Sequence, residues 1–315
     1  MQRLVVLICT HDRAELLARA LASLDRADVP PGWSVEVLVV ANACRDGTAA
    51  LLEGRTAAGA PGLPLAWFAE PVPGKSNALN SALSRIDADL VGFVDDDQRV
   101  DPGYLQALCN AADAHPEADM FCGLLVPDWD GREPAWVHDD GPYRIYPLPV
   151  PRFDPGGSAR ELDTTQTIPG GGNLAVRASW FPRVGPFSTA LGPTGHDLGG
   201  SEDIDWLLRA VGLGARLRYV PEMRQYHHVD HERLRLRYLM RKAFRRTEST
   251  VGHLAGPAVK GVPRHVYRKT AVYALKAVTA LSGARRRFYL VRTAAALGEW
   301  SGYRARRGSA ASPEG

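Results

Sequence analysis

The stretch LVVLICTHDRAELLARALASL, residues 4–24, combines two patterns that decide the fold. Its first seven residues form an unbroken apolar run rich in strand-forming side chains. Behind that run, Leu17, Leu21 and Leu24 recur with the period of an α-helix. An apolar strand followed at once by an amphipathic helix is typical of a parallel α/β sheet whose two faces are covered.

The same strand-and-helix unit recurs further along the chain. Apolar runs at residues 35–42, 65–70 and 89–95 each precede a segment with helical periodicity. We therefore predict a Rossmann-like α/β domain with a mostly parallel central sheet and helices on both faces. Such sheets bind their ligands at the carboxyl ends of the strands, so side chains at those ends are the first candidates for a functional site.

Charge divides the chain into two parts. Residues 231–315 hold 19 Lys and Arg against 4 Asp and Glu, whereas the preceding residues hold 19 against 31, although the whole chain carries a net charge of only +3. The acidic first part argues against general nucleic-acid binding, and the basic second part predicts an anionic partner such as a membrane surface or a phosphate. We expect one domain over residues 1–230 and a basic, amphipathic helical extension over 231–315.

In the extension, RLRLRYLMRKAFRRTEST places an apolar stripe among arginines. Two interpretations of this helix remain open: its stripe packs on the body of the protein and its basic face is solvated, or it lies on a membrane surface. Four scattered cysteines without CxxC spacing favour a reducing compartment, and we expect neither a secretory signal nor a membrane-spanning helix. The expected location is the cytoplasm, with peripheral contact at the inner face of the cell membrane.

Three consecutive carboxylates, Asp95, Asp96 and Asp97, follow the fourth predicted strand. Adjacent carboxylates repel one another, and almost no cation stands beside them in the sequence, so they indicate a hard divalent metal, Mg²⁺ or Mn²⁺. The alternative is a solvated acidic turn that caps the next helix. Their position at a strand's carboxyl end favours the ligand site.

Other candidates occur at helix starts and after a late strand. Glu202 and Asp203 open a predicted helix, where a carboxylate either caps the helix or takes a proton from a substrate. His227 follows a predicted strand over residues 216–221 and is a reasonable metal ligand, with His228 as the reserve. Lys75 precedes a helix and can meet a phosphate there, although the loop lacks the Walker spacing.

Taken together, these segments resemble the family 2 glycosyltransferases of the GT-A fold, of the bacterial inverting type. The resemblance covers residues 3–228 and rests on seven motifs in order: CTHDR, VVANACRDGT, GKSNALN, VDDDQ, GGGNLAVR, SEDIDW and YVPEMRQYHH. Each motif alone is weak, whereas seven in the family's order are specific.

The resemblance implies roles for the carboxylates. Asp95 faces the ribose of a nucleotide sugar, and Asp97 binds the metal together with His227. Asp203, next to Glu202 in the catalytic pair, deprotonates an acceptor hydroxyl that attacks the anomeric carbon with inversion. Asp96 could share the metal, and a register shift of one residue would change the role of Asp95.

The resemblance also implies a nucleotide-binding set, with UDP as the expected nucleotide. At the end of the second strand, Ala41 and Asn42 replace the base-binding Asp of many relatives, which leaves the base open. The remaining residues expected to bind the donor are Thr10, Arg13, Asn42, Lys75, Asp95, Asp96, Gly171, Gly172 and Asn173.

The predicted function is transfer of a sugar to the hydroxyl of a lipid-linked saccharide or of a cell-surface glycan precursor. A small secondary metabolite is an alternative acceptor, and groups that bind it are expected in the irregular segment 127–169. The competing classes are a metal-dependent sugar-phosphate nucleotidyltransferase and a non-catalytic sugar-nucleotide sensor. The first should have a glycine-rich first turn, which CTHDRAELL lacks, and the second does not need an intact Glu202–Asp203 pair.

Overall fold

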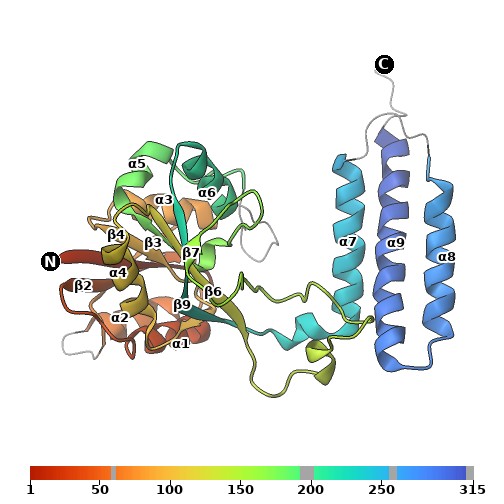
Figure 1. Ribbon diagram of the computed structural model, residues 1–315, viewed down its shortest axis with the longest axis horizontal. Helices are drawn as coiled ribbons and strands as arrows, with labels where there is room; N and C mark the ends of the chain where they lie inside the picture. The colour runs from red at the N-terminus through yellow and green to blue at the C-terminus, as the bar shows by residue number, and fades with distance from the viewer. Residues whose placement is uncertain (58–61, 192–201, 255–260, 310–315) are drawn as a thin grey trace. The chain divides into compact units, whose positions relative to one another are not determined.

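The computed structural model describes residues 1–57, 62–191, 202–254 and 261–309 (Figure 1). Its contacts divide the chain into two compact units. The sheet unit comprises Met1–Asp128 and Pro151–His228, and the helical unit comprises Trp129–Val150 and Val229–Gly315. The segment Trp129–Val150 therefore groups with the C-terminal helices, while a division into independent domains near residue 230 stays a prediction.

Nine strands of the described residues form one sheet in the order β3-β2-β1-β4-β8-β6-β9-β5, with β7 paired to β9. The first four strands are mutually parallel, which confirms the prediction for this half. β8 is antiparallel to both of its neighbours, so the sheet becomes mixed beyond β4. The strands are β1 (Gln2–Thr10), β2 (Trp33–Asn42), β3 (Leu65–Glu70), β4 (Leu90–Phe93), β5 (Gln98–Val100), β6 (Met120–Asp128), β7 (Arg160–Glu161), β8 (Leu174–Arg177) and β9 (Leu217–His228).

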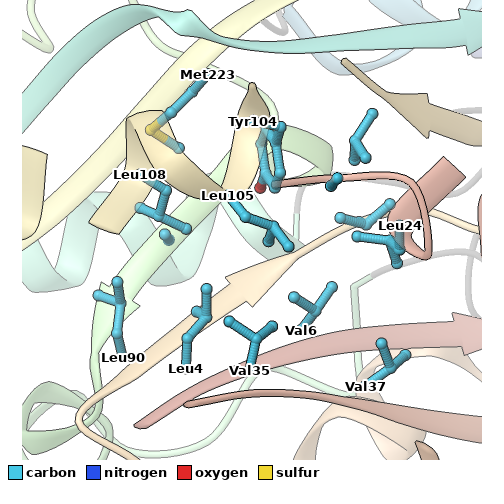
Figure 2. Close-up of a cluster of buried hydrophobic side chains, with 14 of the residues drawn as sticks. Leu4, Val6, Leu24, Val35, Val37, Leu90, Tyr104, Leu105, Leu108 and Met223 are labelled. Carbon is cyan, nitrogen blue, oxygen red and sulfur yellow. The ribbon is translucent and has the colours of Figure 1, made fainter. Parts of the chain in front are cut away.

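The apolar run of β1 supplies both faces of the sheet, as its unbroken pattern predicts. Leu4 and Val6 belong to a core cluster that includes side chains of α1 and α4, whereas Leu7 belongs to a second cluster with α3 and α6. Figure 2 shows the first cluster, with Leu105 of α4 close to the strands. Each fully buried aliphatic side chain contributes roughly 1.5–3 kcal/mol. Helices thus cover both faces, as predicted.

The helices of the sheet unit coincide with the predicted helical segments, except for a short helix after β8 that the sequence pattern does not predict. They are α1 (Ala14–Leu24), α2 (Thr48–Thr56), α3 (Lys75–Leu83), α4 (Tyr104–Ala114), α5 (Phe181–Val184) and α6 (Glu202–Gly212), with short 3-10 turns η2 (Gly171–Asn173) and η3 (Ala178–Trp180). The α3 and α6 helices start at Lys75 and Glu202, so their free N–H ends carry candidate site residues toward the same edge of the sheet.

The predicted end of the last strand at residue 221 is wrong. β9 continues through His227 and His228, because Gln98 of β5 and Pro127 of β6 both stand opposite His227 and extend the ladder past Pro221. His227 is therefore held by strand pairing on both sides, and His228 pairs with Asp128 of β6. They do not lie in a loop after it.

The helical unit contains α7 (Leu236–Leu254), α8 (Arg264–Val278) and α9 (Gly283–Ser309), with the 3-10 turns η1 (Ala135–His138) and η4 (His231–Leu234). This confirms a basic helical C-terminal extension. Within the described residues, no helix is both long and apolar enough to cross a membrane.

The apolar stripe of α7 packs against α9. The Thr247 hydroxyl of α7 donates to the Ala295 carbonyl of α9 at 2.7 Å. A Cβ on Gly298 would lie 2.1 Å from the Phe244 carbonyl oxygen, so the two helices approach closely where α9 has no side chain. The partner of α7 is thus another helix of the same unit, which neither interpretation of the stripe named.

An apolar stripe on α8 remains exposed. Tyr267, Leu275 and Val278 are 54%, 64% and 85% exposed, and their spacing places them on one side of the helix. Leu281, directly beyond the helix, is fully exposed as well. Much of the exposed apolar surface of the basic extension thus lies on α8, whereas the sequence pattern predicts it on α7.

Candidate active site

The carboxyl ends of the parallel strands bring the predicted site residues together, as the fold requires. Asp95, Asp96 and Asp97 follow β4, and Lys75 begins the neighbouring helix α3. The other contributors are Thr10 at the end of β1, Arg13 before α1, Gly171–Asn173 in η2, Glu202 and Asp203 in the first turn of α6, and His227 in β9.

Asp95 forms an ion pair with Lys75, whose Nζ lies 2.6 Å from Oδ1. The amide of Gln98 donates to the other carboxylate oxygen at 3.3 Å. Burial opposes ionisation of Asp95, but the charge and hydrogen bond of Lys75 prevail and lower its pKa below the usual value. Burial likewise opposes the charge on Lys75, whereas Asp95 and Glu202 raise the pKa of its ammonium. The pair is therefore ionised at neutral pH.

Asp96 points into the protein. Its carboxylate accepts a hydrogen bond from the Thr10 hydroxyl at 2.8 Å and contacts the Arg13 guanidinium at 2.9 Å. Burial raises the pKa of Asp96 from 3.8 to about 6, with Arg13 opposing and Asp97 adding to the shift. This carboxylate anchors Thr10 and Arg13, so their predicted contact with a nucleotide stays a prediction.

Asp97 and His227 face each other. Nε2 of His227 lies 3.4 Å from Oδ1 of Asp97, while Nδ1 is directed to the His228 carbonyl at 2.8 Å. Neighbouring ligands of an octahedral ion at about 2.1 Å lie about 3 Å apart, so one imidazole nitrogen and one carboxylate oxygen fit a shared Mn²⁺ or Mg²⁺ ion. His228, the reserve ligand, contributes a backbone N–H that donates to the Asp97 carbonyl at 2.8 Å.

The triple carboxylate has protein cations beside it, contrary to what its sequence neighbourhood indicates. Arg13 contacts both Asp96 and Asp97, at 2.9 and 3.1 Å, and Lys75 contacts Asp95. Repulsion among the carboxylates is thus already reduced, and it does not by itself require a metal. The argument for a metal now rests on the donor set of Asp97 and His227.

Glu202 and Asp203 occupy different environments in α6. Glu202 is 3% exposed, its Oε2 has no hydrogen-bond partner among the described residues, and burial raises its pKa. Asp203 accepts hydrogen bonds from the backbone N–H groups of Gly171 and Ile204, the second at 2.8 Å. The carboxylate of Asp203 is therefore oriented by backbone donors, as a positioned base requires.

The glycine-rich turn fits closely between two carboxylates. A Cβ on Gly171 would lie 2.5 Å from the Cβ of Asp203, and a Cβ on Gly172 would lie 2.5 Å from Oδ2 of Asp95. Lys75, Asp95, Gly171 and Asp203 line one small cavity of about 20 Å³. The turn thus brings the proposed ribose-binding and base carboxylates to the same space.

Two predicted donor-binding residues use their side chains inside the protein. The Asn42 amide donates to the Glu70 and Val72 carbonyls at 3.2 and 2.7 Å. The Asn173 amide donates to the Leu124 and Met223 carbonyls at 3.0 and 2.8 Å. Both N–H donors of each side chain are occupied, so these residues fix the loops of the site, and direct contact with a nucleotide stays a prediction.

Sequence reasoning missed the contributions of Gln98 and Gln225. Gln98 contacts Asp95 and stands next to Gly172, while Gln225 is fully buried and donates to Oδ1 of Asn173 at 3.2 Å. Gln98 directly follows the three carboxylates, and that position was the available signal. Gln225 gives no such signal, because its partner lies far away in the sequence.

Among the described residues, Asp12, Cys44 and Asp46 also lie close enough to hold one ion. Asp12 already accepts hydrogen bonds from the backbone of Arg45 and Asp46 at 2.6 and 3.2 Å, and Asp46 accepts one from Ala14 at 3.0 Å. These contacts fix the loops after β1 and β2, and we assign no metal there.

The mixed sheet, covered by helices on both faces and with carboxylates at its strand ends, has the architecture of the GT-A fold. The family described as Glycosyl transferase family 2 matches residues 5–184, more than half of the chain, and the chain belongs to this family.

Two curated relatives are similar in sequence. The succinoglycan biosynthesis protein ExoM of Rhizobium meliloti (strain 1021) is 26% identical over 258 residues, which cover 81% of this chain and 76% of the relative. The glucosyl-dolichyl phosphate glucuronosyltransferase of Haloferax volcanii is 24% identical over 157 residues, or 50% of this chain. The matched part is 48% of that second relative's length.

Solved structures confirm the GT-A fold. Residues 1–349 of S. aureus TarS in complex with UDP-GlcNAc align with a TM-score of 0.56 at 15% identity, over 98% of this chain and 92% of that one. The longer TarS chain is covered to 55%. The mannosyltransferase PcManGT from Pyrobaculum calidifontis, in complex with GDP-Man and Mn²⁺, aligns with a TM-score of 0.52 at 18% identity, over 99% and 76% of the two chains.

Proposed function

We propose that this protein is an inverting, metal-dependent glycosyltransferase that moves a sugar from a nucleotide-diphosphate sugar, with a UDP-sugar as the first candidate, to an acceptor hydroxyl. One observation carries the proposal: η2 brings Asp95, next to Lys75, and Asp203 to a single cavity at the carboxyl ends of the strands. That arrangement supports the proposal, because a donor-facing carboxylate and a base would have to lie close together at the end of the sheet.

Each residue has a definite task in this reaction. Asp203 takes the proton of the acceptor hydroxyl, whose oxygen then bonds to the anomeric carbon as the bond from that carbon to the diphosphate breaks. Asp95 orients the ribose, and Lys75 and Arg13 supply positive charge where the diphosphate departs. Attack opposite the leaving group inverts the configuration.

The residues present fit a divalent ion. Asp97 and His227 would hold Mg²⁺ or Mn²⁺, which when bound neutralises negative charge on the departing diphosphate. The Mn²⁺ in the PcManGT complex supports this choice of ion. Asp96, held by Thr10 and Arg13, is turned away from this pair and positions Arg13.

For the acceptor, we propose a lipid-linked saccharide or a cell-surface glycan precursor. The names of the two curated relatives, a succinoglycan biosynthesis protein and a glucosyl-dolichyl phosphate glucuronosyltransferase, support a glycan or lipid-linked acceptor over a small metabolite. The UDP-GlcNAc complex of TarS supports a nucleotide-sugar donor.

The test measures donor binding and turnover with a panel of UDP-, GDP- and dTDP-sugars, with and without Mn²⁺. We expect one nucleotide class to bind in a metal-dependent manner. Asp97→Ala should abolish metal-dependent binding, and Asp203→Asn should retain binding but lose turnover. If no sugar nucleotide binds under any metal condition, the proposed roles of these residues are wrong together.

Matched histidine variants test the metal assignment. We expect His227→Ala to weaken Mn²⁺ binding strongly, because its Nε2 faces Asp97. His228→Ala should have a small effect, because the contact of His228 with Asp97 uses its backbone N–H. Electron paramagnetic resonance of Mn²⁺ measures binding without any substrate. Equal losses in the two variants would contradict the assignment.

We also propose that the helical unit contacts an anionic membrane surface at the inner face of the cell membrane through α8. Exposed Tyr267, Leu275 and Val278 supply apolar area, and the net positive charge of residues 231–315 supplies attraction. In vesicle flotation, Leu275→Ser with Val278→Ser should reduce binding. Leu213→Ser, at a 53% exposed leucine of the sheet unit, is the control that should leave it unchanged.

A further inference from the structure

The helical unit contains a second, much larger cavity. It has a volume of about 970 Å³ and lies between α7, α9 and the segment 140–149, all of which belong to the helical unit. Figure 1 shows α7 and α9 side by side in this unit. Cavities of roughly 300–1,000 Å³ are the size that small ligands occupy.

The lining is strongly basic. Lys242 and Arg246 of α7, Arg292 of α9 and Arg144 of the 140–149 segment face it, against a single lining carboxylate, Asp140. Lys242 and Arg246 are four residues apart, so they lie on the same side of α7. Positive charge therefore reaches this cavity from three separate segments.

The cations of the two helices are not neutralised by the protein. In the described parts of the chain, Lys242, Arg246 and Arg292 form no ion pair with a carboxylate. Desolvation, followed by the charges of Arg233 and Arg246, lowers the pKa of Lys242. An anion bound between these side chains would relieve their mutual repulsion.

One neighbouring arginine of α9, Arg287, does have a carboxylate partner. Arg287 contacts Asp139 at 3.2 Å and lies over the Trp136 ring at 4.9 Å. Arg285 lies 5.8 Å from the ring centre of Tyr143. Of the cations that line the cavity, Arg292 lies 5.0 Å from the ring centre of Phe288 and Arg144 lies 5.3 Å from that of Tyr146. Among the described residues, neither of these two arginines forms an ion pair with a carboxylate, so their charges stay available to an anion.

The lining also includes several apolar side chains. Phe288 and Val291 of α9, Leu239 and Ala243 of α7, and Ile145 and Leu148 of the loop segment contribute hydrocarbon surface. The Phe288 ring packs against Tyr143 at a centroid distance of 5.8 Å, so this wall is fixed. A ligand that uses the whole cavity must combine a charged group with a hydrocarbon chain.

We propose that this cavity binds a phosphate group carried on a hydrocarbon chain, with Lys242, Arg246 and Arg292 at the phosphate. A phosphate monoester carries up to two negative charges and accepts the paired N–H donors of a guanidinium, which matches several convergent cations better than one carboxylate does. The chain lies along the apolar wall. This site is separate from the one proposed to perform transfer, and its occupancy is measured without any sugar donor.

The test uses the full chain and monomeric dodecyl phosphate, with binding followed by isothermal titration calorimetry. The charge variant is Lys242→Gln with Arg246→Gln. The control is Arg264→Gln with Arg268→Gln on α8, which removes two exposed charges at the same four-residue spacing outside the cavity. We expect the first pair to weaken binding at least roughly tenfold, because it removes two charged donors, and the second to leave it nearly unchanged.

Two further measurements address the apolar part. Inorganic phosphate should bind at least roughly tenfold more weakly than dodecyl phosphate, because it buries no hydrocarbon. Ala243→Phe, which fills the cavity, should weaken dodecyl phosphate while circular dichroism shows unchanged helix content. Equal losses in the α8 control, or equal affinities for the two phosphates, would overturn the proposal.

A competition arm distinguishes the source of the ligand. Phosphatidylcholine vesicles with phosphatidic acid are added to the dodecyl phosphate complex and compared with phosphatidylcholine alone. Displacement only by the phosphatidic acid vesicles assigns the site to a membrane lipid, and the absence of displacement assigns it to a water-borne amphiphile. Either result supports a phosphate amphiphile site, whereas displacement by phosphatidylcholine alone contradicts the role of charge.

Discussion

Adding one methyl group to Gly171 should damage turnover far more than folding. The added Cβ would lie 2.5 Å from the Cβ and 2.8 Å from Oδ2 of Asp203, whereas ordinary contacts begin at 3.4 Å, so the carboxylate must move by about 1 Å. A displacement of that size costs about 100-fold in rate, or about 2.7 kcal/mol in activation free energy. Gly171→Ala should therefore lose about two orders of magnitude in kcat.

The adjacent glycine provides the control. In Gly170→Ala the added methyl meets its nearest atom, Oδ2 of Asp203, at 3.9 Å, an ordinary van der Waals distance. Donor turnover, donor affinity and thermal unfolding are measured for both variants with the nucleotide sugar that the panel identifies. The reasoning is refuted if the two variants keep equal kcat, or if Gly171→Ala loses activity only in proportion to lost folded protein.

The remaining predictions concern charge, helix packing and chain continuity. Lys75→Met leaves Asp95 without its cation, so we expect a loss of roughly 3 kcal/mol in unfolding free energy at pH 8 by urea denaturation. Lys75 lowers the pKa of Asp95, so the stability that this ion pair contributes is present above the ordinary carboxyl pKa and is lost as pH falls through the lowered pKa. The difference in unfolding free energy between the wild type and Lys75→Met should therefore shrink in acid. A difference that does not change with pH would contradict this reasoning. Gly298→Ala should lower the melting temperature of the helical unit despite the better helix propensity of Ala, whereas Gly283→Ala, whose methyl meets nothing within 4 Å, should not. A chain truncated after residue 230 should aggregate, because the cluster around Val137 loses Leu234 from its core, and size-exclusion chromatography would reveal a monomer if this is wrong.

The sequence was most informative where patterns are local. The third strand was predicted at residues 65–70 and is observed as Leu65–Glu70, because prolines at 64 and 71 bound a compact apolar run. The grouping of Asp95 with Lys75 can also be predicted from the sequence, since the parallel order of the strands brings both residues to one edge of the sheet. Both predictions depend on the period of apolar residues, which is a local property of the sequence, and on the rule that connections between parallel strands are right-handed.

Long-range pairing could not be predicted in the same way. Asp95, Asp96 and Asp97 look alike in sequence, yet Asp95 pairs with Lys75, Asp96 accepts a hydrogen bond from Thr10, and Asp97 faces His227. The stripe of α7 indicates a buried face without naming its partner, which is α9. A single sequence contains no signal for contacts of this kind, because the partners are separated by tens of residues.

The chain passes between the two units three times, at residues 128/129, 150/151 and 228/229. Two of these passages leave the sheet side by side, because Asp128 of β6 and His228 of β9 are register partners. If the helical unit is bound to a surface, a force on that unit acts on these two strand ends. The next rung of the ladder is Pro127 with His227, so mechanical load applied to the helices reaches the proposed metal ligand within one residue.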